Sequence, residues 1–363
     1  MVSKALKMDG LLTYPNVRLS PLYDELVGGK LRCGVCERRC IIPLGEVGFC
    51  RTRMNIDGRA YTLVYGDISS ISVNPIEKKP FFHFWPGSSA LTIGSWSCNF
   101  TCPWCQNYEI STSSPEPLKA NYVSPDKFVR MIEHERCHGC SISFNEPTIL
   151  FEYSLDVFPL ARQAGFYNTF VSNGYMTLDA LRMLRDAGMD AIKFDVKGCE
   201  EAVRKYCGAN VNIVWRNVSE AKRLGMHVEV VMLVIPGIND DEECLTSIAK
   251  RHLEEAGPES PLHFTRFYPT YKMMDRHRTP FETLERAHRL AVAEGVKYVY
   301  VGNIPGHRLE NTYCPECGEL LIERYGFSVR RYRITPEKKC PRCRLAIPII
   351  GEYIKSSGIS WMF

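Results

Sequence analysis

The sequence predicts an α/β protein in which a partial or complete TIM-type (β/α) barrel lies between a small N-terminal Cys-rich cap and a C-terminal zinc ribbon. Apolar, β-rich runs alternate with segments of helical period, and glycine closes several of those segments, which predicts the barrel. Two CxxC pairs near the C-terminus predict the ribbon. We expect the cap over residues 1–90, the barrel over 91–307 and the ribbon-like segment over 308–363.

The composition is that of a globular protein with a substantial core, since 45% of the 363 residues are hydrophobic and 11% are aromatic. A net charge of +4 gives no case for nucleic acid as the main partner. The basic block 330–333 is equally consistent with a solvated strand face. No run approaches the roughly 18 apolar residues of a membrane span, and the N-terminus has no signal-peptide pattern. We therefore expect a cytoplasmic protein without a membrane partner.

The predicted cap carries the first of several tight cysteine groups, which have the spacing of metal ligands in a reducing compartment. Its members are Cys33, Cys36, Cys40 and Cys50. Four thiolates within eighteen residues can close a tetrahedral zinc site or hold an auxiliary iron–sulfur cluster, and unligated buried cysteines are the third possibility. We expect a metal, with a slight preference for zinc. Short strands are expected at 61–65 and 68–73.

The predicted barrel begins with the apolar run 91–96. Repeated β/α order calls for parallel strands joined by right-handed helical crossovers, and an open doubly wound sheet is the alternative architecture. The expected strands are 91–96, 141–144, 168–171, 191–194, 228–235, 262–267 and 298–301. The expected helices are 125–137, 148–164, 177–187, 212–224, 241–256 and 281–294.

Three cysteines follow the first barrel strand directly, namely Cys98, Cys102 and Cys105. Thiolates spaced by three and then two residues can reach three irons of one 4Fe-4S cluster, whose usual complement is four ligands. One iron is then open, as the substrate position of a catalytic zinc is open. A three-cysteine pattern can also be part of a zinc site, so the spacing alone does not distinguish an iron–sulfur cluster from a zinc ion.

Polar residues follow most of the predicted strands. Because the chemistry of parallel barrels sits at the carboxyl ends of the strands, these residues should converge on one rim. Any one of them alone could be a turn or a helix cap. The residues at three of these strand ends that we single out are Asn145, Glu146, Ser172, Asn173, Asp195 and Lys197.

The two C-terminal pairs are Cys314 with Cys317 and Cys340 with Cys343, separated by a 22-residue gap. Two such knuckles complete a tetrahedron of thiolates, which predicts a structural zinc ion because no position is left open. A rubredoxin-like iron centre is the alternative.

Trp104, immediately before the last cysteine of the loop, resembles the signature of the radical S-adenosylmethionine (SAM) superfamily. The continuation into Gln106 and Asn107 is similar to the pyruvate formate-lyase (glycyl-radical enzyme) activating enzymes. The order of cap, cysteine loop, Asn145-Glu146-Pro147, the run 298–303 and ribbon resembles the AmmeMemoRadiSam-system radical SAM enzyme over nearly the whole chain.

The resemblance implies a barrel of the radical SAM type, with SAM on the open iron and Trp104 beside its adenine. Contacts to SAM would come from Asn145, Glu146, Ser172 and Asn173. Asp195 and Lys197 resemble the Asp-x-Lys of the active-site surroundings in the activating enzymes, with a surface ion pair as the other interpretation. Val171 departs from that family, which has a polar residue there, so a monovalent-cation site is not carried over.

The function that the resemblance implies is reductive cleavage of SAM at a 4Fe-4S cluster to methionine and a 5'-deoxyadenosyl radical, which abstracts hydrogen from a substrate. The expected partners are a protein or peptide substrate and a one-electron donor such as flavodoxin or ferredoxin. An enzyme acting on a small molecule or RNA is the first alternative. The second is a zinc-organised binding or assembly module without radical chemistry.

Overall fold

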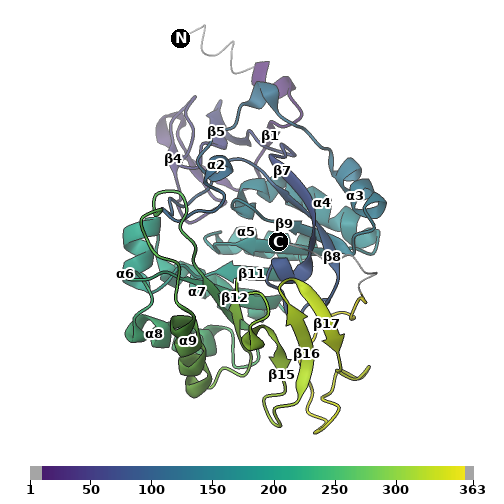
Figure 1. Cartoon of the computed structure of the whole chain (residues 1–363). Coiled ribbons are helices and arrows are strands. Elements are labelled where there is room, and N and C mark those ends of the chain that lie inside the picture. The colour runs from purple at the N-terminus through teal and green to yellow at the C-terminus, as the bar shows by residue number, and fades with distance from the viewer. Residues whose placement is uncertain (1–9, 356–363) are drawn as a thin grey trace. The chain divides into compact units, whose positions relative to one another are not determined.

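The structure is a computed structural model that describes residues 10–355. The described chain divides into two compact units, and Figure 1 labels many of their helices and strands. The first unit takes the described residues up to Val73, together with Leu91–Thr101 and Cys105–Asp190. The second takes Asn74–Ala90, Cys102–Trp104 and the described residues from Ala191 onward. Within residues 10–355 no helix combines the length and apolar character that a membrane crossing requires.

The first unit begins with two small antiparallel sheets, in the orders β1-β6-β5 and β2-β3-β4. Val17, Ile56 and Leu63 form a buried core beside the first of them. These sheets agree with the expectation of a β-containing cap, although the strand expected at 61–65 lies earlier, at 59–62. The elements are η1 Gly10–Thr13, β1 Arg18–Leu19, β2 Tyr23–Glu25, η2 Val27–Gly29, β3 Leu31–Cys33, β4 Ile41–Ile42, β5 Arg53–Ile56 and β6 Arg59–Thr62.

The β/α part of the first unit has its strands in the order β10-β9-β8-β7. Strands β9 and β10 are parallel, with Tyr167 opposite Gly139. Helices α3 and α5 begin where a side chain caps them, since Ser124 accepts from Lys127 N at 3.3 Å and Thr177 from Ala180 N at 3.1 Å. The elements are β7 Ser70–Pro75, β8 Ser89–Gly94, α2 Tyr108–Ser111, η4 Pro117–Lys119, α3 Pro125–His134, β9 Gly139–Ile142, η5 Pro147–Leu150, α4 Phe151–Gln163, β10 Tyr167–Ser172 and α5 Leu178–Ala187.

The second unit continues the β/α order with parallel strands β11, β12, β13 and β14, each paired with the next. Gly295 ends α9 in the left-handed conformation, with φ of 114°, as the glycine after a predicted helix should. The elements are η3 Ile76–Lys78, β11 Ala191–Asp195, α6 Glu200–Ala202, η6 Val203–Cys207, α7 Val211–Arg223, β12 His227–Val234, α8 Glu242–Glu255, β13 Leu262–Arg266, α9 Phe281–Glu294 and β14 Val299–Gly302.

A buried polar network in the second unit holds residues 82–83 against strands β12 and β13. The Glu229 carboxylate accepts from the backbone N of Phe82 at 2.9 Å and of His83 at 2.8 Å. The same carboxylate lies 2.8 Å from His227 Nε2 and 2.7 Å from His263 Nε2. Burial raises the pKa of Glu229, but the hydrogen bonds and charges of His227 and His263 outweigh it and hold the pKa below its usual range.

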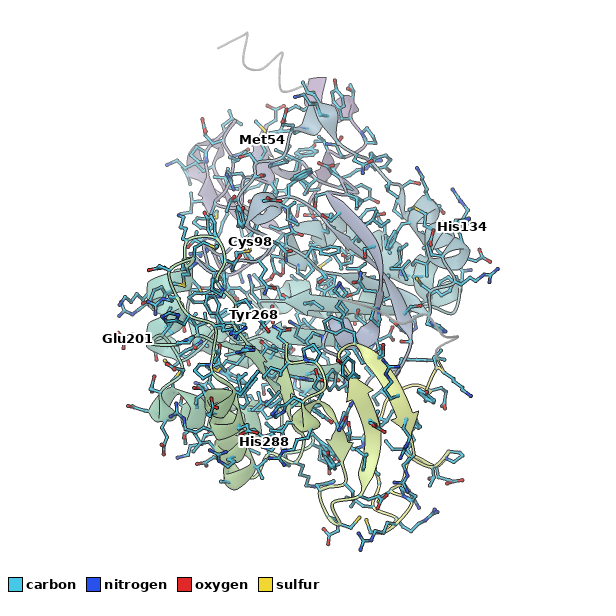
Figure 2. The ribbon with its side chains drawn as sticks, in the orientation of Figure 1. Met54, Cys98, His134, Glu201, Tyr268 and His288 are labelled. Carbon is cyan, nitrogen blue, oxygen red and sulfur yellow. The ribbon has the colours of Figure 1, made fainter. Side chains whose placement is uncertain are left out.

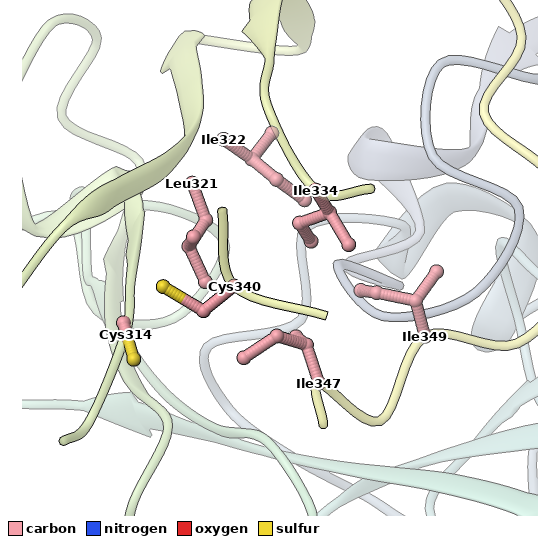
Figure 3. Packing of buried hydrophobic residues seen from close by; sticks show 7 residues of the cluster. All are labelled: Cys314, Leu321, Ile322, Ile334, Cys340, Ile347 and Ile349. Atoms are coloured by element: carbon pink, nitrogen blue, oxygen red, sulfur yellow. The ribbon is translucent and has the colours of Figure 1, made fainter. Parts of the chain in front are cut away.

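The C-terminal segment is an antiparallel sheet in the order β15-β16-β17, after η7 Arg308–Glu310. Its strands are β15 Thr312–Tyr313, β16 Leu320–Tyr325 and β17 Ser328–Tyr332. Arg330 and Arg331 of the basic block are exposed on β17, so the block is a solvated strand face as expected. Figure 3 shows the small core of this segment, in which two of the ribbon cysteines lie among aliphatic side chains.

The alternation predicted from the sequence is confirmed, since each of the seven expected strands and six expected helices overlaps an observed element. The parallel pairing is confirmed within each unit. Closure into a barrel stays a prediction. The sequence analysis missed η6 and the strands β16 and β17, which are short or lie between the cysteine pairs.

Candidate functional site

The three-cysteine loop begins where β8 ends. Cys98 and Cys105 belong to the first unit, whereas Cys102 and Trp104 belong to the second. The β8 strand ends at Gly94, where a Cβ would lie 2.9 Å from Phe144 Cβ and 3.0 Å from Ser143 O. Only glycine therefore allows β8 to approach the chain after β9 this closely. Cys98 is labelled in Figure 2.

Asn145 fixes the start of the cysteine loop from the end of β9. Its Oδ1 accepts from Ser95 N at 3.0 Å, and its Nδ2 donates to Ser97 O at 2.8 Å. Arg51 holds the same loop from the other side, since it donates to Ser97 Oγ at 3.3 Å and to Thr112 O at 2.7 Å. The structure thus gives Asn145 a positioning role toward the residues that precede Cys98.

Glu146 is a buried carboxylate at the centre of the first unit's hydrogen bonds. Oε1 accepts from Thr148 N at 3.0 Å, from Thr148 Oγ1 and from Ser172 Oγ at 2.7 Å. Oε2 accepts from Asn173 N at 2.9 Å. Burial raises the pKa of Glu146 above its usual range, and these donors act in the opposite direction. The residue therefore joins the loop after β9 to the loop after β10.

Asn173 carries this network to the cysteine loop. Its Nδ2 donates to Asn99 Oδ1 at 2.7 Å and lies 3.9 Å from Cys98 Sγ. Its Oδ1 accepts from Tyr175 N at 3.0 Å. Glu146, Ser172 and Asn173, which were expected on one rim, are thus brought together with Cys98 in the first unit.

Two buried polar atoms beside Cys98 have no hydrogen-bond partner within residues 10–355. They are Asn99 Nδ2 and Ser95 Oγ. Buried polar groups in proteins are nearly always hydrogen-bonded, so such atoms mark a place where a further polar group fits. Together with the thiol of Cys98, they fit an iron–sulfur cluster and a polar cofactor on it. Asn99 was not singled out from the sequence, where an asparagine between two cysteines has no distinguishing pattern.

In the second unit, Cys102 lies beside Cys207 of η6, with their sulfurs 3.4 Å apart. The hydrogen bond with Cys207 and then burial raise the pKa of the Cys102 thiol, while the charge of Lys197 lowers it. Trp104 is buried, with its ring centroid 5.7 Å from that of Tyr206, and its Nε1 has no partner among the described residues. Cys207 was not singled out from the sequence, where it has no neighbouring cysteine.

Asp195 and Lys197 form the ion pair that their spacing indicated, at 3.1 Å, and Asp195 also pairs with Lys193. Burial raises the pKa of Asp195, but the charges of Lys193 and Lys197 outweigh it and hold the pKa at about 2. Lys193 could have been found from the sequence, because residues i and i+2 of a strand lie on the same face. Since Lys197 and Asp195 act electrostatically on Cys102, this pair is part of the cysteine loop's surroundings and not a remote surface pair.

The C-terminal cysteines converge as predicted. The ligand atoms of Cys314, Cys317, Cys340 and Cys343 all lie within 4.8 Å of one another. In each knuckle a backbone N–H donates a hydrogen bond to the carbonyl oxygen of the first cysteine. Gly318 N donates to Cys314 O at 2.9 Å, and Arg344 N donates to Cys340 O at 3.0 Å. Four thiolates at this spacing can hold one metal ion. The remaining predicted ligands, Cys33, Cys36, Cys40 and Cys50, line a separate pocket in the first unit.

Residues 95–246 match the Radical SAM superfamily. The chain is 42% identical over 335 residues to the uncharacterized protein MJ0808 of Methanocaldococcus jannaschii, a match that covers 92% of this chain and 100% of that protein.

Two solved structures of low similarity were also found. One is a domain of a pyruvate-formate lyase-activating enzyme from Bacteroides vulgatus, at 12% identity, covering 46% of this chain and 99% of that chain with a TM-score of 0.41. The other is Streptococcus suis SuiB bound to S-adenosylmethionine, at 10% identity, covering 66% and 56% with a TM-score of 0.48.

The superfamily match begins three residues before Cys98 and spans the cysteine loop, Glu146, Asn173 and Asp195. Residues 95–246 are therefore a radical SAM superfamily domain, and the chain as a whole belongs to one family with MJ0808.

Proposed function

We propose that this chain is a radical SAM enzyme of the AmmeMemoRadiSam-system type that cleaves SAM reductively and acts on a protein or peptide. When bound, the 4Fe-4S cluster and SAM would supply a 5'-deoxyadenosyl radical that abstracts hydrogen from the substrate. Cys98, Cys102 and Cys105 would hold the cluster. The observation that carries the proposal is the network from Glu146 through Asn173 to Asn99, next to Cys98, since it ends on the buried Nδ2 of Asn99, which has no partner among the described residues.

The chain's own residues have separate tasks in this proposal. Asn145 and Arg51 fix the backbone that leads into Cys98. Glu146 fixes the backbone N of Asn173 and the hydroxyl of Ser172. Its Oε2 accepts a hydrogen bond from Asn173 N and retains capacity for the SAM ammonium. Trp104 offers an apolar face with an indole N–H, which suits an adenine ring.

Asp195 and Lys197 would lie along the path of the substrate. Asp195 stays ionised near neutral pH, because two lysines face it. An ion pair of this kind can orient polar backbone groups of a peptide without changing its protonation state. Reducing electrons would come from a one-electron donor such as flavodoxin or ferredoxin, and a cytoplasmic location agrees with the free thiols that the mechanism requires.

The central test is 5'-deoxyadenosine formation by anaerobically reconstituted protein supplied with SAM and dithionite. We expect wild type to form it and Cys102→Ala to form none. The control is Cys137→Ala, a buried cysteine after α3 that belongs to none of the three cysteine-ligand groups. It should retain the wild-type rate. Undiminished formation by Cys102→Ala would refute the assignment.

A further inference from the structure

The N-terminal cysteines surround one pocket, although they come from a hairpin and a following turn. Cys33 ends β3 and donates its backbone N–H to Cys40 O at 2.9 Å, so both lie at the loop end of the β3–β4 hairpin. Cys36 lies in the loop between them, and Cys50 returns to the pocket after Gly48. The full lining is Cys33, Cys36, Arg38, Cys40, Ile42, Gly48, Cys50 and Arg53.

The spacing of these sulfurs differs from that of the C-terminal group. Two sulfurs bound to one zinc ion at about 2.3 Å lie no more than about 4.6 Å apart. Among the described residues, Cys314 and its three partners are the one group of three or more metal-binding side chains whose ligand atoms all lie within 4.8 Å. No three of the N-terminal cysteines meet that condition. The N-terminal sulfurs are therefore spread more widely than one zinc ion requires, as sulfurs that bind different irons of one cluster are.

The pocket wall also offers a buried donor. Arg53 is 2% exposed, and its two terminal nitrogens donate to Ile149 O at 3.1 Å and to Glu152 Oε2 at 2.6 Å. Its Nε has no hydrogen-bond partner within residues 10–355. Hydrogen bonds to the sulfurs are characteristic of iron–sulfur clusters, and the Phe49 N–H already points to Cys40 Sγ at 3.4 Å. Arg53 Nε–H is a further donor in the pocket wall that is available to a bound group.

Positive charge around the pocket agrees with the same occupant. A cluster with four thiolates carries net negative charge, and both Arg38 and Arg53 line the pocket. The Arg38 guanidinium lies 4.2 Å from the ring centroid of Phe49, and its Nε donates to Asn99 O at 2.8 Å. Arg38 therefore connects the wall of this pocket to the residue that follows Cys98.

We propose that Cys33, Cys36, Cys40 and Cys50 hold a second 4Fe-4S cluster, closed by four protein thiolates and separate from the cluster at Cys98. Four ligands leave no iron open, so this cluster carries electrons or stabilises the fold and does not bind SAM. The proposal replaces our slight preference for zinc from the sequence. It does not depend on the proposed function, because it concerns other cysteines.

The test counts iron, acid-labile sulfide and zinc per chain after anaerobic reconstitution. The informative variant is Cys98→Ala with Cys102→Ala and Cys105→Ala, which leaves the N-terminal site unaltered. Wild type should hold about eight irons per chain. The triple variant should hold about four, and an electron paramagnetic resonance signal should appear when its cluster is reduced. A triple variant without iron would overturn the proposal. Two zinc ions per wild-type chain would then indicate that the N-terminal cysteines bind zinc. One zinc ion or none would indicate that they are unligated.

A second measurement assigns the remaining cluster to this pocket. In the triple variant, Arg38→Gln removes a positive charge from the pocket wall and should move the midpoint potential to a more negative value. The control is Arg32→Gln, because Arg32 is exposed on β3 and is not part of the lining. Equal potentials in the two variants would contradict the assignment.

Discussion

At the scale of single residues, Glu146 is held by donors on both carboxylate oxygens, so its replacement tests the network directly. In Glu146→Gln, an amide NH₂ would face an N–H or O–H donor. We expect the free energy of unfolding in urea to fall by about 1–3 kcal/mol. SAM affinity, measured anaerobically by calorimetry, should fall roughly tenfold as residues 172–174 shift.

The matched control is Glu133→Gln on α3, where the carboxylate is exposed and the same change should leave both quantities unaltered. If Glu146→Gln unfolds and binds SAM as wild type does, Glu146 does not organise the site.

Asp195 gives a prediction about how the free energy of unfolding depends on pH. Its folded-state pKa of about 2 lies below the usual 3.8, so the ionised form stabilises the fold. This contribution, about 2 kcal/mol, is fully present above the unfolded-state pKa and is lost as pH falls from 4 toward 2. Urea unfolding of wild type and Asp195→Asn should therefore differ by a constant amount between pH 5 and 7 and converge below pH 4. A difference that already shrinks between pH 7 and 5 would contradict this origin.

At the scale of elements, the C-terminal knuckles should carry a structural zinc ion separate from the radical chemistry. Cys314 is 2% exposed and packs in the small core of Figure 3. We expect Cys314→Ser to lose about one zinc per chain by metal analysis, while 5'-deoxyadenosine formation partly survives. Zinc absent from wild type, or equal in the two proteins, would show that the ribbon assignment is wrong.

The elements themselves could be predicted because their determinants are local. Apolar periodicity predicted the seven strands and six helices of the β/α part. Glycines such as Gly188 and Gly295 marked helix ends, where the left-handed conformation is needed. The network around Glu229 was not predicted. Glu229, His227 and His263 lie on two strands separated by α8, and only their pairing brings the side chains together.

The site was predictable in its residue types more than in their roles. Contacts of Asn145 and Asn173 to SAM stay a prediction, and the structure shows that both side chains hydrogen-bond to the cysteine loop. The sequence also could not show whether the N-terminal cysteines are placed for a single metal ion or for an iron–sulfur cluster. Distances between sulfurs depend on how Cys33, Cys40 and Cys50 are folded together, and residue spacing does not fix them.

At the scale of the whole molecule, the class of substrate is the open question that activity can decide. Candidate proteins, peptides, RNA and small metabolites should be supplied with SAM under reducing, anoxic conditions. We expect a protein or peptide to accelerate SAM cleavage and to acquire a radical, and Asp195→Ala to reduce both by about tenfold or more. Acceleration by a small metabolite or an RNA alone would contradict a polypeptide substrate and leave the radical SAM assignment intact.

The spacing of the C-terminal thiols has a consequence for handling the protein. Cys314 Sγ and Cys343 Sγ lie 3.5 Å apart, and Cys343 is exposed to solvent. A chelator can reach a metal held there, and the freed thiols are close enough to be oxidised by air to a disulfide after a small movement. The disulfide would then prevent the metal from rebinding. Zinc added afterwards would rebind only after a thiol reductant had reopened the bond.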